Sequence, residues 1–456
     1  MKNHPRVRIA PSPSGNLHIG TARSALFNFL FAKKEKGTFI VRIEDTDKER
    51  SKEEYEENIL EGLSWLGLSW NEFYKQSESG EIYRKHLKKM IDAGSVYLSK
   101  EDIKKPGQRS EVIRFKNPNR KITFTDIIRG DVTFDSTELG DFIVARSEDE
   151  PLYHLAAVID DHEMEVSHVI RGEDHVSNTP RQILIQEAIG ANRPIYAHIP
   201  LILAPDRTKL SKRHGAISVV EFRESGYLPQ ALINYMALLG WNPGTDQEVL
   251  SIDELVEQFD LTRVQKGGAI FDEEKLKWIN TEHKKLLTDK ELEVELEKIK
   301  NRVRVMWENP SEVTLERLTG VLKVSGSIYT TLAEQEVFIE ETGLKDYILN
   351  EPDYEPEQLK WKKQKDLEGT KRHLTQVRDA LNLLDENKFT AENIKKTIWQ
   401  YAEKEGRGDV LWPMRFALSG KEKSPDPFSL AGIFGKELTI SRINHALIKL
   451  QKNVSS

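Results

Sequence analysis

The first 95 residues alternate between two patterns of hydrophobic and polar positions. Short apolar runs over 6–10 and 39–43 are typical of buried strands. Between and after these runs, apolar residues recur at the spacing of an amphipathic helix. These helices are expected from His18 onward, over 51–66 and over 81–93. Strands that alternate with helices predict a mostly parallel sheet, whose ligand crevice lies beyond the carboxyl ends of its strands.

Residues 96–150 follow a different pattern, and we interpret them as a β-rich insertion. Its strands are expected over 111–115, 122–125, 131–134 and 141–145. Beyond the insertion, three apolar runs indicate that the first sheet resumes, over 153–159, 166–170 and 198–203. The sequence therefore predicts one α/β domain of Rossmann type, which is built from 1–95 and 151–205 and is interrupted by the insertion.

The rest of the chain shows helical periodicity and little β-alternation. Residues 206–285 are expected to form a separate, mostly helical part with a turn at 240–243. Residues 286–456 are expected to form an all-α region. Its apolar positions at helical spacing include Leu292, Leu296, Ile299, Leu374, Val377, Leu381 and Leu384.

The composition narrows the class of protein. The chain has 456 residues, of which 38% are hydrophobic, and a formal net charge of −7. No stretch approaches the ~20 apolar residues of a membrane span, and the N-terminus lacks an apolar signal segment. We therefore expect a soluble, cytoplasmic protein with no membrane partner. The negative net charge argues against general affinity for nucleic acids, although a specific RNA partner depends only on local basic patches.

The absence of cysteine excludes disulfides, thiolate catalysis and cysteine-based zinc sites. The remaining candidates for metal binding are histidines and carboxylates, namely Asp160, Asp161, His162, His168, Glu173, Asp174 and His175. Their spacing matches no zinc pattern. We expect polar residues around a nucleotide site here, and neither zinc nor another protein-bound metal.

The segment from Pro11 to Gly20, with the sequence PSPSGNLHIG, lies between the first predicted strand and helix. A helix start offers free backbone N–H groups and a positive dipole end, which suit a phosphate. Gly20 would allow a nucleotide to approach the backbone, and His18 would donate to phosphate oxygens. The alternative interpretation is a proline-rich loop that leads into a surface helix.

A second polar segment contains Lys209, Ser211, Lys212 and Arg213 after a predicted strand. Its three cations within five residues suit a polyphosphate, and lysine acts as a movable point charge for a leaving pyrophosphate. Short basic runs are also common on solvated surfaces. The phosphate interpretation depends on the presence of the first segment.

Together these two segments resemble the signature motifs of class I aminoacyl-tRNA synthetases. The chain is most similar to the bacterial type of glutamyl-tRNA synthetase, because further motifs of that family follow in the same order. They lie at 8–15, 39–47, 153–156, 160–162, 169–175, 240–243 and 271–272. The likeness covers the first two thirds of the chain strongly. The helical tail also fits the bacterial type, since its archaeal and eukaryotic counterparts carry β-barrels there.

The resemblance implies ATP, with Mg²⁺, as cosubstrate and L-glutamate as the amino acid. It implies that ATP is bound by Pro11, Ser12, Gly20, Asp174, Lys209, Lys212 and Arg213, and that His18, Lys209 and Lys212 stabilise phosphate charge. It places glutamate against Arg8, Ala10, Ser12, Glu44, Tyr153 and Arg171. A plainer role for Arg171 is a salt bridge to Glu173 or Asp174. Ala157 stands where some relatives have asparagine, so one polar contact to the substrate is missing or is supplied by water.

The resemblance also assigns roles to the parts of the chain. Residues 96–150 would hold the acceptor end of tRNA, 206–285 would contact its stem, and 286–456 would bind the anticodon. The expected product is tRNA(Glu) charged at its terminal adenosine by a monomeric enzyme, and the sequence leaves open whether tRNA(Gln) is also charged. Two alternatives are an ATP-dependent nucleotidylyltransferase and a non-catalytic tRNA-binding paralogue.

Overall fold

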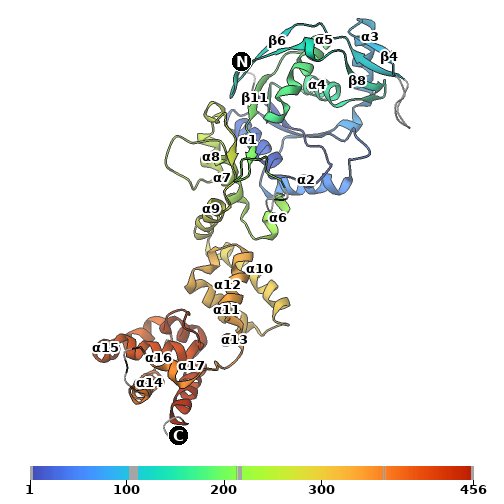
Figure 1. Cartoon of the computed structure of the whole chain (residues 1–456). Helices are drawn as coiled ribbons and strands as arrows, with labels where there is room; N and C mark the ends of the chain where they lie inside the picture. The colour runs from blue at the N-terminus through green and yellow to red at the C-terminus, as the bar shows by residue number, and fades with distance from the viewer. Residues whose placement is uncertain are drawn as a thin grey trace. The chain divides into compact units, whose positions relative to one another are not determined.

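The computed structural model describes residues 4–101, 111–211, 213, 218–362, 364 and 366–452 (Figure 1). The chain divides into two compact units, 1–283 and 284–456. Each unit has its own core and is described by itself.

The first unit begins with a three-stranded parallel sheet in the order β1-β2-β3. Its strands are β1 (Arg6–Ile9), β2 (Thr38–Ile43) and β3 (Glu72–Lys75). The associated helices are α1 (Ile19–Lys34), α2 (Glu53–Trp65) and α3 (Gly80–Asp92). The predicted alternation of strands and helices is confirmed, and β3 is an additional strand that the apolar pattern did not indicate.

A second sheet has the order β10-β11-β6-β7. It consists of β10 (His168–Gly172), β11 (Ile195–Ile199), β6 (Lys121–Asp126) and β7 (Gly130–Asp135). The backbone N–H of Ser167 donates to the carbonyl of Arg6 at 3.0 Å, and the side chain of Asn28 donates to the carbonyl of Ile170 at 2.9 Å. These bonds hold β10 beside β1 and α1, so that the carboxyl ends of β1, β2 and β10 meet at one edge.

The predicted strands of the 96–150 segment are present, but they belong to two sheets. Strands β4 (Val96–Lys100), β5 (Glu111–Phe115), β8 (Phe142–Ser147) and β9 (Glu150–Pro151) form an antiparallel sheet. The β6–β7 hairpin joins the second sheet instead, because Asp126 on β6 pairs with Tyr196 on β11. Part of this segment is therefore built into the sheet that carries β10.

Two expectations about later strands are wrong. The run 153–159 is not a strand but the start of α4 (Tyr153–Glu163). Apart from His154, the run is apolar and contains two alanines, so its periodicity does not separate a buried helix from a buried strand. The expected strand 198–203 is divided into the end of β11 and the short β12 (Ile202–Leu203), because Pro200 has no N–H for a central ladder.

The remainder of the first unit is mostly helical, as predicted. Its helices are α5 (Thr179–Ile189), α6 (Val219–Glu224), α7 (Pro229–Leu238), α8 (Ile252–Gln258) and α9 (Glu273–Lys285). The short strand β13 (Ala269–Ile270) pairs with β12. Gly240 has a φ of +94°, a conformation that favours glycine at the predicted turn.

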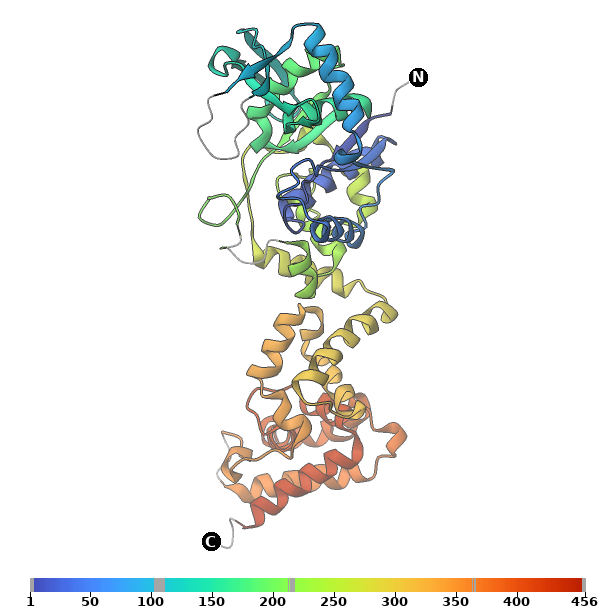
Figure 2. The ribbon, with the colours of Figure 1, turned by 90° about the vertical axis from the view of Figure 1, so that its right-hand side faces the viewer.

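The second unit is helical throughout its described residues (Figure 2). Its helices are α10 (Asp289–Met306), α11 (Glu312–Ser325), α12 (Leu332–Glu341), α13 (Leu344–Leu349), α14 (Leu367–Asn382), α15 (Ala391–Glu405), α16 (Arg407–Ser419) and α17 (Pro427–Lys452). Its core includes the predicted Leu296, Ile299, Leu374, Val377 and Leu381. Across the described parts of both units, no helix has the length and apolar character needed to cross a bilayer.

Candidate active site

A cavity of about 440 Å³ opens where the carboxyl ends of β1, β2 and β10 meet the start of α1. The structure brings most of the predicted site residues together in its lining: Arg8, Ala10, Pro11, Ser12, His18, Gly20, Glu44, Tyr153, Arg171, Asp174 and Lys209. Arg213 is not in the lining, and it donates to Thr208 at 3.3 Å. Lys212 lies outside the described residues.

His18 is the N-cap of α1, which fixes the position of its ring. The backbone is extended at this residue, and the ring Nδ1 accepts a hydrogen bond from the N–H of Gly20 at 3.0 Å. A Cβ on residue 20 would lie 3.3 Å from that nitrogen, so a side chain larger than that of Gly20 would crowd the imidazole ring. The cavity therefore contains a helix N-terminus and an imidazole, both suited to an anion.

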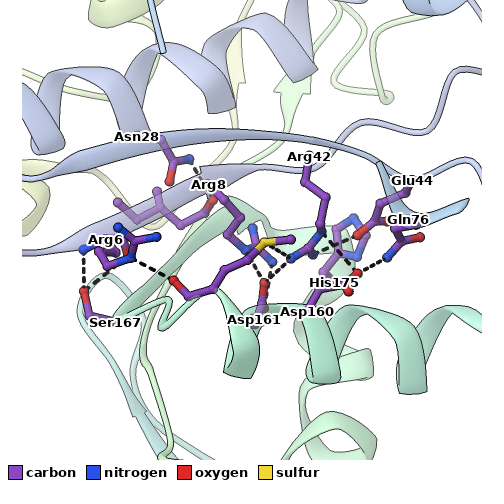
Figure 3. A network of polar contacts seen from close by, with 12 residues as sticks. Arg6, Arg8, Asn28, Arg42, Glu44, Gln76, Asp160, Asp161, Ser167 and His175 are labelled. Carbon is purple, nitrogen blue, oxygen red and sulfur yellow. Dashed lines mark hydrogen bonds and ion pairs between the residues drawn. The ribbon is translucent and has the colours of Figure 1, made fainter. Parts of the chain in front are cut away.

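Arg8 is held from behind by a carboxylate. Its Nε and Nη2 lie 3.1 and 3.3 Å from the two oxygens of Asp161 on α4 (Figure 3). Asp161 also accepts from Nη1 of Arg42 at 2.7 Å. One carboxylate thus fixes two guanidinium groups, one of which lines the cavity.

Arg42 on β2 is fully buried and is surrounded by acids. Besides Asp161, it donates to Glu44 at 3.0 Å and lies 3.7 Å from Asp160. Burial opposes the charge of Arg42, but the three carboxylates more than compensate and raise its pKa. Burial raises the pKa of Glu44 and of Asp160, whereas the pKa of Asp161 is lowered because Arg8 and Arg42 outweigh its burial.

Sequence reasoning missed Arg42, although an arginine inside the otherwise apolar strand TFIVRI was an available signal. A charged residue is almost never fully buried unless it is paired. Sequence reasoning also treated Asp160 and Asp161 only as general polar residues. Asp160 accepts from Tyr83 and Gln76 at 2.8 and 2.7 Å, so both acids belong to the network beneath the cavity.

Arg171 on β10 makes no salt bridge to Glu173 or Asp174, so the plainer role considered for it is wrong. Glu173 pairs with Arg129, and Asp174 lies 3.3 Å from the Nζ of Lys209. Burial lowers the pKa of Arg171. Its guanidinium therefore brings positive charge to the cavity wall without a carboxylate partner among the described residues.

Four histidines of the first unit, of which His175 lines the cavity, are wholly or partly buried and resist protonation. Burial, with nearby arginines, lowers the pKa of His154 to about 4 and that of His175 to about 4. Burial also lowers the pKa of His168 and of His198. The folded rings therefore stay neutral at a pH where the same rings, exposed by unfolding, take up protons.

This difference predicts acid sensitivity of the first unit. Each such ring contributes stability that is complete above its unfolded pKa near 6.5 and is lost as the pH falls toward its folded value. The slope is up to about 1.4 kcal/mol per pH unit and ring. Urea unfolding at pH 7.5, 6.0 and 5.0 should show a falling midpoint, with a shallower fall in His154→Phe. An identical slope in that variant would mean that His154 is protonated in the folded chain.

In chemical terms, the cavity combines the buried guanidinium groups of Arg8 and Arg171, the buried carboxylate of Glu44, a helix N-terminus and an exposed lysine. This set suits an acidic amino acid beside a polyphosphate. No group of three or more histidine, aspartate or glutamate side chains able to hold a metal occurs among the described residues.

Comparisons with known proteins agree with this chemistry. Residues 5–108 and 98–278 match the catalytic domain of class I tRNA synthetases (E and Q), and residues 297–447 match an anticodon binding domain. These matches confirm the predicted order of an α/β catalytic region and a helical region.

Curated relatives match over nearly their whole length. Glutamate–tRNA ligase 1 of Syntrophomonas wolfei is 39% identical, covering 97% of this chain and 96% of its own. The glutamate–tRNA ligase of Carboxydothermus hydrogenoformans is 41% identical, with coverages of 94% and 97%. A crystal structure of a glutamate tRNA ligase from Elizabethkingia meningosepticum, in complex with its amino acid, superposes with a TM-score of 0.84 at 33% identity, covering 98% of this chain and 100% of that one. The chain therefore belongs to the glutamate–tRNA ligase family of class I aminoacyl-tRNA synthetases.

Proposed function

We propose that this chain activates L-glutamate with ATP and transfers the glutamyl group to the 3′-terminal adenosine of tRNA(Glu). The observation that carries this proposal is the cavity itself, in which Arg8, Arg171 and Glu44 lie beside the start of α1 and Lys209. The first three groups suit the side-chain carboxylate and the ammonium group of glutamate, and the last two suit the phosphates of ATP.

In this proposal, Arg8 and Arg171 bind the side-chain carboxylate of glutamate and the Tyr153 hydroxyl adds a hydrogen bond. Glu44 accepts from the ammonium group, and Ser12 and Ala10 contribute polar contacts. Glutamine is rejected because its neutral amide would leave buried positive charge unpaired.

ATP is proposed to lie against Pro11, Ser12, Gly20 and Asp174, with its phosphates near His18, Lys209, Lys212 and Arg213. Mg²⁺ would arrive with ATP, because Mg²⁺ commonly binds substrate phosphates and keeps several waters. The α-carboxylate oxygen of glutamate forms a bond to the α-phosphorus, and the bond from that phosphorus to pyrophosphate breaks. His18 and the lysines stabilise the charge that develops on the phosphates.

In the second step, a hydroxyl of the terminal ribose of tRNA, by class analogy the 2′-hydroxyl, attacks the glutamyl carbonyl and AMP leaves. No protein nucleophile is required, so positioning and electrostatics supply the catalysis. We propose that residues 96–150 hold the acceptor end, that 206–285 contact the stem, and that 286–456 read the anticodon. We also propose that the enzyme acts as a cytoplasmic monomer.

The test is glutamylation of separate tRNA(Glu) and tRNA(Gln) transcripts with labelled glutamate, beside the Lys212→Ala variant. We expect the wild-type chain to charge tRNA(Glu), and Lys212→Ala to lose about 100-fold or more in kcat, as for removal of one group that stabilises developing charge. Charging of tRNA(Gln) as well would identify a non-discriminating enzyme.

Two results would contradict the proposal. ATP turnover without charging of either tRNA would favour a nucleotidylyltransferase. Binding of tRNA without any pyrophosphate exchange, in the presence or absence of tRNA, would favour a non-catalytic paralogue.

A further inference from the structure

Arg171 stands at the end of a buried chain of hydrogen bonds that begins on the β6–β7 hairpin. Its Nε lies 3.1 Å from Nε2 of His198, and Nδ1 of the same ring lies 2.6 Å from Oδ2 of Asp126. The side chains of His198 and Asp126 are both completely buried. The three residues come from β10, β11 and β6, which are neighbours in one sheet.

The carboxylate of Asp126 is fixed as an acceptor on both oxygens. Oδ1 accepts from the backbone N–H groups of Ile128 and Arg129, each at 2.9 Å, and Oδ2 accepts from the backbone N–H of His198 at 3.0 Å. Burial alone would raise the pKa of Asp126, but the His198 ring and these N–H groups lower it. The group facing Nδ1 of His198 is therefore an ionised oxygen.

This arrangement determines the tautomer of His198. An ionised oxygen at 2.6 Å requires a proton on Nδ1, and burial keeps the ring neutral. Nε2 must then carry a lone pair, because a neutral imidazole has one donor and one acceptor. That lone pair accepts from Nε of Arg171, while Nη2 of Arg171 donates to Thr179 at 2.9 Å.

These bonds occupy one edge of the guanidinium. Within the described part of the chain, Nη1 of Arg171 has no hydrogen bond, and Arg171 lines the cavity. We propose that His198 and Asp126 are positioning residues for the glutamate pocket: Asp126 fixes the His198 tautomer, and His198 holds Arg171 with its unoccupied edge toward the substrate carboxylate. This proposal rests on the proposed role of Arg171 in binding glutamate.

The experiment is a double-mutant cycle on Asp126→Asn and His198→Gln, with steady-state KM and kcat measured for glutamate and for ATP. The side-chain amide that Asp126→Asn introduces can donate to Nδ1, which moves the ring proton to Nε2 and sets two donors face to face at Arg171. The His198→Gln variant offers an acceptor to Arg171 and has no ring tautomer, so Asp126 has nothing to fix in that background.

We expect Asp126→Asn to raise the KM for glutamate about 10- to 100-fold, the usual cost of disturbing a hydrogen bond to a charged group. The KM for ATP should change less than about twofold, and kcat should change less than the KM for glutamate. In the His198→Gln background, the same aspartate change should cost only about twofold, because no ring tautomer remains for Asp126 to fix. Any effect on the backbone bonds of Asp126 is common to both backgrounds, so it cancels when the two factors are compared. His198→Leu, which removes the acceptor, should resemble Asp126→Asn.

The matched control is Asp131→Asn on the exposed part of the same hairpin, where Asp131 accepts only from Thr125 among the described residues. It should leave every constant within about twofold of the wild type, as expected for a surface change. A separate measurement uses ¹⁵N-labelled histidine: long-range ¹H–¹⁵N spectra should show His198 as the Nδ1–H tautomer in the wild type and as Nε2–H in Asp126→Asn.

Each failure has its own signature. Equal factors for Asp126→Asn in both backgrounds, parallel rises in the KM for ATP and glutamate, or an Nε2–H ring in the wild type would overturn the positioning role. If the wild-type chain does not charge glutamate at all, the proposed function fails instead, and the spectra still decide whether Asp126 sets the tautomer.

Discussion

Replacement of Arg42 by methionine should lower the free energy of unfolding of the first unit by about 3–5 kcal/mol at pH 7, the usual cost of removing one partner from a buried ion pair. Methionine fills a similar volume, so little of this loss comes from a cavity. The cost arises because Glu44, Asp160 and Asp161 lose the cation that compensates them inside the protein. Hydrogen exchange of peptides that cover β2 and α4, together with urea unfolding, measures the effect.

The pH dependence of this loss gives a further check. Without Arg42, Asp161 keeps Arg8 as its partner. Glu44 and Asp160 lose their ion-pair partner, so protonation of these two carboxyls lets the variant recover as the pH falls. In the wild type, the pKa of Asp161 is lowered from its ordinary value of 3.8, so its pairing with Arg8 and Arg42 is still complete at pH 5. Protonation in the variant therefore makes the difference between variant and wild type smaller at pH 5 than at pH 7.

Arg50→Met is the matched control, because Arg50 is exposed. It should change the free energy of unfolding by no more than about 0.5 kcal/mol. A loss in Arg42→Met that is no larger than in the control, or one that grows toward pH 5, would show that the network does not stabilise the fold.

The sequence correctly predicted those strands and helices that are determined by the local pattern of hydrophobic and polar residues. The strands at 6–10 and 39–43 and the helix that begins after His18 each have a clear period and a clear boundary. The predicted cavity residues were also accessible to sequence reasoning, because residues that follow parallel strands meet at one sheet edge. Arg8, Glu44 and Arg171 lie on or directly after the three strands whose ends form the cavity.

The residues that support the site from behind were not predictable in the same way. Asp126 and His198 are 72 positions apart, and Arg42 and Asp161 are 119 positions apart. Each pair depends on which strands or helices become neighbours and in what register. The attachment of β6 to β11 brings Asp126 to His198, and the helical form of 153–163 brings Asp161 to Arg8.

His18→Asn should lower the kcat for glutamylation of tRNA about 100- to 1000-fold, the range for removal of one donor that stabilises charge in a transition state. Asparagine caps a helix as well as serine or aspartate does, so the start of α1 should keep its capping bond. The KM for ATP should rise much less than kcat falls, because the imidazole acts mainly on charge that develops during the reaction.

Two further variants separate catalysis from stability. His18→Ala should show the same fall in kcat and should also lose about 1 kcal/mol of stability, because it has no capping group. Asn16→Ala, at an exposed position in the same loop, should leave both quantities near the wild-type values. If His18→Asn kept a normal kcat, the ring would serve only as the cap that its bond to Gly20 describes, and the phosphate charge would have to be stabilised by the α1 N-terminus and the lysines alone.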